Sequence, residues 1–352
     1  MIVPSFLKFP VYAFDLSDLS YKYLRLTETK KGILVDDFGE GDIPPGIIEH
    51  GEIKKQDVLQ AFLKDLLSKK NIRFVALSLP EEKGFVRNIK LVGLKDEKEI
   101  GGALRLQIEE HVPLPPDEVV FDFSVASKEK DYYDVVLSAF PKQFIDFYAD
   151  TFFEVGAIPV VMESEMSASL KAIIKKDFLG TAMLIDWGKT RTSFAIVENG
   201  ALRFASSISI GGQDINETLK KNLGIDFAKA EELKKKYGLT NSGSEGGAVF
   251  QALVPMVTAI GEEAEKYVSF WQTHSEKKKS VSQIFLSGGD ANLKGLKEYL
   301  ELELGVPVQM ANPWVNVHFP KYYLPELGRS DSIRYSAAVG LALSALSKGK
   351  TL

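Results

Sequence analysis

Cysteine is absent from the 352-residue sequence, and histidine and tryptophan are rare, with four and three residues. A chain without cysteine forms no disulfide and no thiolate metal site, which fits a reducing cytosol. The four histidines are scattered and lack the short spacing of a metal-binding motif. No Ser–His–Asp arrangement is recognisable, so the sequence gives no indication of a hydrolase of that type.

Long hydrophobic runs are also missing. No uninterrupted apolar stretch approaches the roughly 18 residues that a membrane-spanning helix needs. The first residues lack the basic region and the apolar core of a signal peptide. We therefore expect a cytoplasmic protein that inserts no segment of its own into the membrane and reaches the membrane only through a partner.

The remaining composition is that of a globular protein. Hydrophobic residues make up 45% of the chain and charged residues 26%, which argues against disorder. The net charge is −5, so the composition gives no indication of nucleic-acid binding. A chain of 352 residues exceeds one small core and suits two domains, or one domain with insertions.

Two stretches share one pattern of strand, polar turn and strand. The first, AFDLSDLSYKYLRL, covers residues 13–26, and the second, TAMLIDWGKTRTSFAIVENG, begins at Thr181. Asp186 stands in the second stretch where Asp15 stands in the first, at the end of an apolar strand. We interpret the two stretches as an internal pseudo-repeat, which predicts two domains of related design.

The segment between the repeats contains a unit with its own strands and helices. The strand FVRNIKL leads to a helix that Asp96 and Glu99 begin as a capping box, and two strands and a helix ending near Val155 follow. After the second hairpin, helices dominate, and GSEGGA (243–248) predicts a flexible link before a long helix over 249–274. The predicted units are a first domain over 1–83, an α+β insert over 84–156, a return to the first domain over 157–179, a second domain over 180–325 with a helical subdomain over about 213–275, and a closing helix within 326–352 that packs on the first domain.

Three segments combine an apolar strand with a loop of glycine, serine, threonine or aspartate, at residues 11–22, 183–193 and 284–292. In this order they resemble the actin-like ATPase fold, an α/β fold in which two related domains enclose a nucleotide cleft. Longer stretches are similar to the type IV pilus assembly protein PilM family over nearly the whole chain, and FtsA is the nearest relative by architecture. These stretches are SLPEEKGFVRNIKL, LRLQIEEHVPLPPDEVVFDFSV, SISIGGQDINETLKKNLGIDFAKAEELKKKYGL and LSGGDANLKGLKEYLELELGVPVQMANPW.

The resemblance implies a site for ATP or ADP with Mg²⁺. Asp15 and Asp186 match the two hairpin aspartates that act on the metal through water. The glycine pair Gly211–Gly212 would bring backbone N–H groups to the nucleotide at a helix start, although each glycine by itself also suits a simple turn. The implied contacts are Asp15, Ser17, Ser20 and Lys22 in the first hairpin, Asp186, Gly188, Lys189, Thr190 and Thr192 in the second, Gly211 and Gly212, Glu231 and Lys234 beside the ribose and adenine, and Gly288 and Gly289 beneath the base.

Both hairpins depart from the family pattern. Ser17 replaces the expected glycine, and Asp18 brings a second carboxylate toward a polyanion. Lys189 and Arg191 occupy a bend that usually holds small residues. We expect Mg²⁺-dependent nucleotide binding that is weaker than in a glycine-bearing relative; the open alternative is that the two hairpins close on each other as a salt-bridged, empty cleft. No residue is recognisable as the one that positions an attacking water, so we expect no efficient hydrolysis.

The resemblance also implies a partner, since family members bind the cytoplasmic tail of PilN, a membrane protein, in a groove that involves the small insert. Val112, Leu114, Phe121 and Phe123 alternate along a proline-rich and then strand-like stretch, which predicts a face for an extended apolar peptide beside a sheet edge. The same four residues also suit the core of the insert. The chain is thus expected to act as an adaptor of a pilus or related secretion platform, with homo-oligomers possible.

Two rival functions stay open at this point. An actin-fold phosphotransferase or small-molecule kinase needs an acidic base near the acceptor hydroxyl, and no such residue has a convincing context in the sequence. An FtsA-like protein would form polymers with ATP. FtsA-like chains end in an amphipathic membrane helix, and we expect no such helix after the sequence SALSKGKTL.

Overall fold

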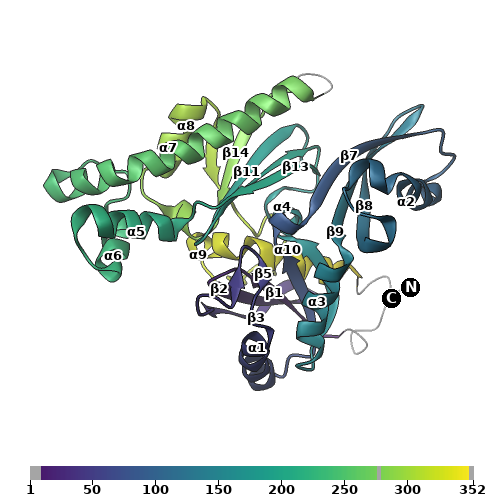
Figure 1. Ribbon diagram of the computed structural model, residues 1–352, viewed down its shortest axis with the longest axis horizontal. Coiled ribbons are helices and arrows are strands. Elements are labelled where there is room, and N and C mark those ends of the chain that lie inside the picture. Colours follow the sequence, from purple (N-terminus) through teal and green to yellow (C-terminus); the bar gives the residue numbers. More distant parts are fainter. Residues whose placement is uncertain (1–8, 276–278, 349–352) are drawn as a thin grey trace.

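The computed structural model describes residues 9–275 and 279–348. Two five-stranded sheets form its two halves, with an additional three-stranded sheet at one side (Figure 1). The first sheet has the order β10-β6-β1-β2-β3 and the second the order β13-β12-β11-β14-β15. Their strands are β1 (Val11–Leu16), β2 (Ser20–Thr29), β3 (Gly32–Asp42), β6 (Phe74–Leu79) and β10 (Ile158–Ser164), and then β11 (Thr181–Trp187), β12 (Thr192–Glu198), β13 (Ala201–Ile208), β14 (Gln283–Ser287) and β15 (Val308–Met310).

The two sheets have the same topology, which confirms the fold predicted from the repeated hairpin. In each sheet three antiparallel strands come first. A later strand then pairs in parallel with the first strand, and a further strand pairs in parallel with that later one. Asp15 lies opposite Lys22 in the first hairpin, and Asp186 lies opposite Ser193 in the second. Because the two sheets share this topology, the carboxyl ends of β1 and β11 lie at corresponding edges of their sheets. Ligands of open α/β folds bind at this edge.

One face of the first sheet is covered by short elements and a helix. These are β4 (Ile48–Glu49), β5 (Glu52–Ile53) and α1 (Gln56–Lys70), and the short 3₁₀-helix η2 (Glu81–Lys83) follows β6. Helix α1 buries Leu59, Leu63 and Leu67 at helical spacing, as its apolar stripe predicts. Asn71 ends the helix in a left-handed conformation, which leads the chain directly into β6.

The insert between β6 and β10 has a core of its own. It consists of β7 (Phe85–Val92), η3 (Glu97–Glu99), α2 (Ile100–His111), η4 (Pro116–Glu118), β8 (Val119–Lys128), β9 (Tyr132–Pro141) and α3 (Lys142–Phe153). Helix α2 buries Ile100, Leu104 and Ile108 against the sheet. The sheet order is β7-β9-β8, so β8 pairs with β9 alone among the described strands and leaves one edge open.

The chain returns to the first sheet at its end, as predicted. The closing helix predicted within 326–352 is divided into α9 (Arg329–Ser332), η6 (Ile333–Tyr335) and α10 (Ser336–Lys348). Helix α10 packs on β1, β2 and α4 (Glu165–Ile173). A Cβ atom at Gly340 would overlap the carbonyl oxygen of Ala168, so the backbones of α10 and α4 are in direct contact.

The helical part of the second half consists of α5 (Gly212–Leu223), α6 (Phe227–Tyr237), α7 (Gly243–His274), η5 (Asp290–Asn292) and α8 (Leu296–Leu304). The Asp226 carboxylate caps α6 by accepting the Lys229 N–H at 2.7 Å. The predicted flexible link at 243–248 is wrong, because these residues form the first turns of α7. A Cβ at Gly246 would lie 3.0 Å from Tyr237 Cδ1, so this glycine permits close helix packing instead of flexibility.

No helix in the described ranges is both long and apolar enough to cross a membrane. The predicted domain boundaries fall in connections between these elements, and as domain limits they stay a prediction. Residues 1–8 of the first predicted unit and 349–352 of the last lie outside the described residues.

Candidate functional site

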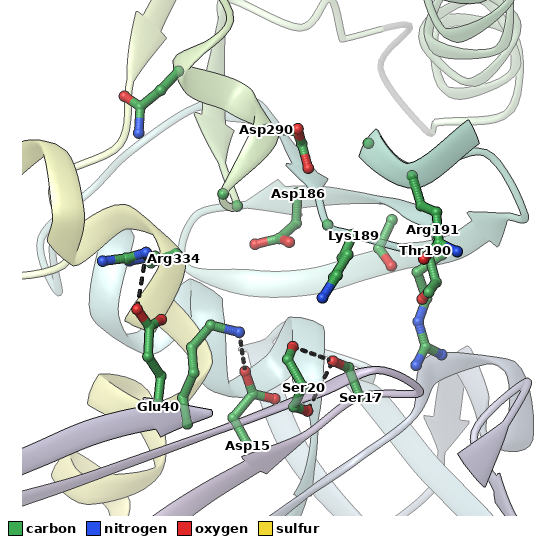
Figure 2. Close-up of a pocket in the computed structure, with 18 of the residues that line it drawn as sticks. Asp15, Ser17, Ser20, Glu40, Asp186, Lys189, Thr190, Arg191, Asp290 and Arg334 are labelled. Atoms are coloured by element: carbon green, nitrogen blue, oxygen red, sulfur yellow. Dashed lines mark hydrogen bonds and ion pairs between the residues drawn. The ribbon is translucent and has the colours of Figure 1, made fainter. Parts of the chain in front are cut away.

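A cavity of about 780 Å³ lies between the two sheets and is bordered by both hairpins. Its size is typical of a site for a small organic ligand. Figure 2 shows Asp186 and Asp290 on one side of this cavity and Asp15, Ser17 and Ser20 on the other. All the residues predicted for a nucleotide line the cavity except Gly211 and Thr192.

The first hairpin is closed by its two serines. The Ser17 amide donates to the Ser20 carbonyl at 2.9 Å, and the two hydroxyl oxygens lie 2.9 Å apart. Ser17 is not among the described residues with positive φ, so replacing glycine by serine leaves no left-handed strain at this bend. Asp15 accepts a 2.9 Å hydrogen bond from Ser78, and Lys22 Nζ lies 3.7 Å from its other oxygen.

Asp18 does not line the cavity, which corrects the expectation that it would repel a bound polyanion. Its carboxylate accepts the backbone N–H groups of His50 and Gly51, each at 3.0 Å, and lies 3.4 Å from Arg191. The negative charge is therefore committed to the loop between β4 and β5. Asp18 thus fixes the position of that loop and does not border the cavity.

The second hairpin places a carboxyl group and several polar atoms at the cavity wall. Burial, together with the charge of Asp15, raises the pKa of Asp186 to about 6, although the Ser287 hydrogen bond opposes this shift. The Gly188 N–H donates to the Arg191 carbonyl at 2.9 Å and closes the bend. Thr192 is buried outside the cavity, and its hydroxyl donates to the carbonyl of Ile210 at 2.6 Å. It is therefore not free to contact a ligand.

Ion pairs connect the second hairpin to the first half of the molecule. The buried guanidinium of Arg191 pairs with Glu82 and Asp18, and lies 4.0 Å from Glu165. Lys189 Nζ lies 2.9 Å from Asp42 at the end of β3. Salt bridges between the hairpins are thus present, yet a cavity of ligand size remains open beside them.

The start of helix α5 differs from the predicted anion site. The N–H groups of Gly212 and Gln213 donate to the carbonyls of Gly188 and Lys189, at 3.0 and 2.9 Å. These N–H groups are therefore already paired within the protein and are not available to a phosphate. A Cβ at Gly211 would lie 2.5 Å from the Lys189 oxygen, so this glycine is needed where the helix meets the hairpin.

The opposite end of the cavity is formed by α6 and the turn after β14. Lys234 is buried, and its ammonium group contacts Asp290 at 2.7 Å, Glu231 at 3.0 Å and the Gly212 carbonyl at 3.3 Å. Burial raises the pKa of Glu231, but the hydrogen bond from Lys235 and the charge of Lys234 outweigh it, so the pKa falls to about 2. Glu231 is therefore ionised at neutral pH, and Lys234 is held by internal partners.

The two glycines of the turn after β14 have different roles. Gly288 has a φ of +93°, and a Cβ there would overlap the carbonyl oxygen of Trp187. Gly289 has nothing within 4 Å of its ideal Cβ position, so its missing side chain leaves space in the cavity. The first glycine is thus required by the backbone, and the second keeps the site open.

A second cavity of about 670 Å³ lies beside the open edge of β8. Phe121 and Phe123 border it, as does the end of α4 with Leu170 and Ile174. Val112 does not border it: the side chain is 1% exposed in the core of the insert, so the prediction that Val112 contacts a peptide is wrong. The remaining lining residues come from the insert, from the first half of the fold with α4, and from the turn between β12 and β13, together with Asn316. They are Leu79, Val120, Asp122, Ser124, Val125, Ala126, Val136, Ser138, Phe140, Ile145, Met162, Glu163, Ser164, Ser167, Lys171, Lys175, Lys176, Asn199, Gly200, Ala201, Leu202 and Asn316.

Leu114 follows the same pattern as Val112, because it packs partly buried against the core of the insert and is absent from the cavity wall. The predicted peptide face therefore coincides with the cavity only at Phe121 and Phe123. The alternation along β8 also turns these two side chains toward the core of the insert, where both pack.

The model of the type IV pilus assembly protein PilM family matches residues 13–346. The chain belongs to this family. A solved structure described as a PilM-PilN type IV pilus biogenesis complex covers 96% of this PilM-family chain and 99% of its own, with a TM-score of 0.79 at 22% identity. MreB5 of Spiroplasma citri bound to ADP covers 99% of both chains, with a TM-score of 0.57 at 14% identity. The fold is therefore that of the actin-like ATPases.

Curated relatives match the PilM-family chain over shorter segments. The cell division protein FtsA of Neisseria meningitidis serogroup B is 29% identical over 49% of this chain and 45% of its own length. The cell shape-determining protein MreB of Escherichia coli K12 is 25% identical over 43% of this chain and 52% of its own. The chain thus spans about half the length of the curated relatives that it matches.

The sequence predictions for this PilM-family chain missed several residues that line the first cavity. Glu165, the first residue of α4, is half-buried there, and one of its carboxyl oxygens is buried without a hydrogen-bond partner. Burial raises the pKa of Glu165 well above its ordinary value, although Arg191 opposes the shift. Asn216, Phe227 and Asp290 also line the cavity. Asp290 follows the predicted glycine pair directly, and Asn216 lies one helical turn after Gly212, so spacing alone would have identified both.

Proposed function

We propose that this PilM-family chain is an actin-like adaptor that binds ATP or ADP and holds the extended tail of a PilN-like membrane partner beside β8. The observation that carries the proposal is the open edge of β8 along a cavity of about 670 Å³. An unpaired strand edge offers backbone N–H and C=O groups to an extended peptide. Family membership and the likeness to a PilM-PilN complex support the choice of partner.

The lining of this groove fits an apolar peptide with polar ends. Leu170, Ile174 and Leu202 supply apolar surface, and Lys175 and Lys176 lie at its rim. Val120 is 41% exposed on β8, so a partner side chain can cover it. Burying such apolar surface contributes about 25 cal/mol per Å², whereas the strand edge fixes the direction of the peptide.

Nucleotide binding is supported by the first cavity. Asp15 and Asp186 approach it from both hairpins, and Ser17, Ser20 and Lys22 add hydroxyl and ammonium groups. No group of three or more histidine or acidic residues in the described ranges could hold a metal ion alone. A Mg²⁺ ion would therefore bind through Asp15 and Asp186 with water and phosphate oxygens, which is its usual coordination in nucleotide sites.

The partner proposal is tested with a synthetic peptide of the cytoplasmic tail of the PilN-like partner. We expect Val120→Asp to weaken binding at least tenfold, because a charge would be buried beside the strand edge. Val92→Asp is the matched control, since Val92 is 71% exposed on β7, the opposite edge of the same sheet. Fluorescence anisotropy measures both. Equal affinities of the two variants would contradict the proposed groove.

The nucleotide proposal is tested by calorimetry with Mg²⁺ and ADP. We expect Asp186→Ala to abolish measurable binding by removing a metal-side carboxylate, and Gly289→Asp to abolish it by filling the open space with a charge. Asp150→Ala, an exposed position on α3, is the control and keeps the wild-type affinity. Binding that survives both site substitutions would place the nucleotide elsewhere.

Slow ATP hydrolysis is a second candidate, and the position of Glu165 favours it. Its carboxyl group lines the cavity with an oxygen that has no hydrogen-bond partner and could orient a water. However, burial raises the pKa of Glu165 well above its ordinary value, which disfavours the ionised form that a general base needs. We therefore expect turnover far below the common enzyme range of roughly 1–10³ s⁻¹, measured as phosphate release, and further reduced in Glu165→Gln.

A further inference from the structure

The edge of the first sheet that lies opposite the first cavity carries the turn between β2 and β3. Asp15, near the carboxyl end of β1, lines the cavity, and β2 runs antiparallel from there to Thr29. Strands β6 and β10 run parallel to β1, so their first residues lie at the same edge as the turn. This edge is therefore remote from the groups that surround a nucleotide.

The connection between β15 and α9 is held against this edge by hydrogen bonds to backbone groups. The Ile33 N–H, next to the β2–β3 turn, donates to the His318 carbonyl at 2.8 Å. Two residues earlier, the Asn316 amide donates to the Ile174 carbonyl at the end of α4 at 2.6 Å. The β2–β3 turn, the end of α4 and the connection over 316–321 therefore lie side by side.

These three segments bring exposed lysines together. We call them the lysine patch: Lys30 and Lys31 in the turn, Lys175 and Lys176 after α4, and Lys321 in the connection. No ion pair joins any of these five ammonium groups to a carboxylate within residues 9–275 and 279–348. The patch thus offers positive charge that the described part of the chain does not neutralise.

The acidic residues near the patch are few. Glu163, on β10, is paired with Lys171 at 2.6 Å. Glu28 and Asp177 are the exposed acids next to the lysines in the sequence. Five lysines therefore outnumber two exposed acids here, although the whole chain has a net charge of −5. Such a local excess of one sign indicates a surface for an anionic partner.

Exposed apolar side chains adjoin the patch. Tyr322 is 89% exposed and Leu324 is 88% exposed, and Lys321 Nζ lies 5.4 Å from the centre of the Tyr322 ring. Tyr323 between them anchors the connection, because its hydroxyl donates to the Val35 carbonyl at 3.0 Å and lies 3.2 Å from the Val35 amide nitrogen. Lysines beside exposed tyrosine and leucine are typical of surfaces at a membrane interface, where both side-chain types keep a polar or apolar part in its preferred medium.

We propose that the lysine patch, with Tyr322 beside it, docks the protein on an anionic lipid surface. Anionic headgroups attract each lysine near the membrane, and the contributions add over the patch. Tyr322 supplies apolar contact at the depth of the headgroups without a membrane-spanning segment. This surface adds a direct contact with the membrane to the contact through a partner.

The second cavity favours a membrane over a nucleic acid as the anionic partner. Lys175 and Lys176 belong to the patch and also border this cavity. A docked patch therefore turns the rim of the groove toward the membrane, from which the tail of a membrane protein comes. This choice of partner rests on the proposed function, whereas the charge of the patch does not.

The test is co-sedimentation of the full chain, without a partner, with vesicles of phosphatidylcholine and phosphatidylglycerol. We expect wild-type protein to bind these vesicles, to bind pure phosphatidylcholine vesicles about tenfold or more weakly, and to dissociate as salt screens the lysines. Lys30→Glu together with Lys31→Glu should lower binding about tenfold or more. The matched control, Lys130→Glu together with Lys221→Glu, makes the same charge change at exposed positions on the insert and on α5, at opposite sides of the molecule in Figure 1, and should change binding less than about threefold.

A second pair of variants tests the apolar part of the surface. We expect Tyr322→Ser to weaken vesicle binding about threefold or more, because it removes the exposed ring beside the lysines. Leu302→Ser is the control, since Leu302 is 87% exposed on α8, away from the patch. Equal effects of the two substitutions would contradict a role of Tyr322 at the lipid surface.

The remaining outcomes separate this inference from the proposed function. Wild-type protein that binds no vesicles, binds both vesicle types equally, or loses binding equally in both lysine pairs overturns lipid docking. Tighter binding to duplex DNA that is lost in the Lys30 and Lys31 variant assigns the patch to nucleic acid and also overturns it. Lys30 and Lys31 border neither cavity, so this variant should keep the wild-type affinity for the partner peptide, and failure of vesicle binding leaves the peptide groove intact.

Discussion

Glu81 is a buried carboxyl group where η2 meets the start of helix α4. Its carboxyl oxygen accepts the Met166 N–H at 3.2 Å. Burial raises the pKa of Glu81 to about 7, although hydrogen bonds from Met166 and Ser164 oppose the shift. Between about pH 4.5 and 7 the folded protein therefore holds a proton that the unfolded chain has released.

This difference makes stability depend on pH. Between about pH 4.5 and 7 the unfolded state binds fewer protons than the folded state, so the free energy of unfolding falls as the pH rises. We expect Glu81→Gln to remove roughly 2–4 kcal/mol of this fall between pH 5 and 8. Urea denaturation at several pH values measures it. Glu110→Gln, exposed on α2, is the control, and an identical pH profile for both variants would contradict the assignment.

Asp18 gives a prediction opposite to the one that its sequence position suggested. Because it binds two backbone N–H groups and Arg191, we expect Asp18→Ala to lower the free energy of unfolding by about 1–3 kcal/mol. The affinity for ADP should change less than threefold, because Asp18 does not line the cavity. Denaturation and calorimetry on the same samples test both parts, with exposed Asp131→Ala as control. A clear gain in affinity would restore the repulsion hypothesis.

At the candidate site, sequence reasoning placed the hairpin aspartates correctly at the cavity wall but not the partners of the charges. Asp15 and Asp186 each follow a buried strand, and a strand end is a local property that the pattern predicts. The contacts of Asp18 reach 32 and 33 residues along the chain, and those of Arg191 reach 173. Such pairings depend on how the two sheets meet, and no local pattern contains that information.

At the scale of elements, the backbones of α4 and α10 are in direct contact, with Gly340 against the Ala168 carbonyl. We expect Gly340→Ala to separate the two helices and to cost about 1–3 kcal/mol or more, because backbone cannot move aside as a flexible side chain can. Thermal denaturation measures the loss.

The matched control is the same substitution in another helix. Gly102 lies in α2 with nothing within 4 Å of its ideal Cβ position, so Gly102→Ala should stabilise the protein by about 0.5–1 kcal/mol through helix propensity alone. A similar effect of both substitutions would mean that the α4–α10 contact tolerates a methyl group.

Elements with strong periodic patterns were predictable, whereas glycine-rich segments were not. The apolar stripe of α1 and the Asp226 cap of α6 each follow from local chemistry that the sequence contains. Residues 243–248 contain three glycines, which favour a loop by propensity, yet they begin α7. Packing against Tyr237 decides their conformation, and tertiary contacts of this kind are invisible to propensity.

At the scale of the whole molecule, the repeated hairpin predicted the duplicated sheet topology, and the insert explains why one half is larger. The insert also contacts the second sheet, since Arg203 on β13 lies 2.7 Å from Asp134 on β9. Within its own sheet, Arg203 also lies 3.2 Å from Glu198. The groove beside β8 is consequently bordered by the insert, by α4 and by the turn between β12 and β13. A peptide in this groove would contact both halves of the fold.

Helix α4 forms a common wall of the two cavities, since Glu165, Met166 and Ser169 face the first and Ser167, Leu170 and Lys171 face the second. A shift of this shared helix on binding of one ligand would alter the site of the other, and thermodynamic linkage makes such an effect reciprocal. We expect Mg²⁺–ADP to change the affinity for the partner peptide by roughly fivefold or more, and the peptide to change the affinity for ADP by the same factor. Two calorimetric titrations, each with and without the other ligand, measure both factors. Unchanged affinities in both would mean that a single helix borders two independent sites.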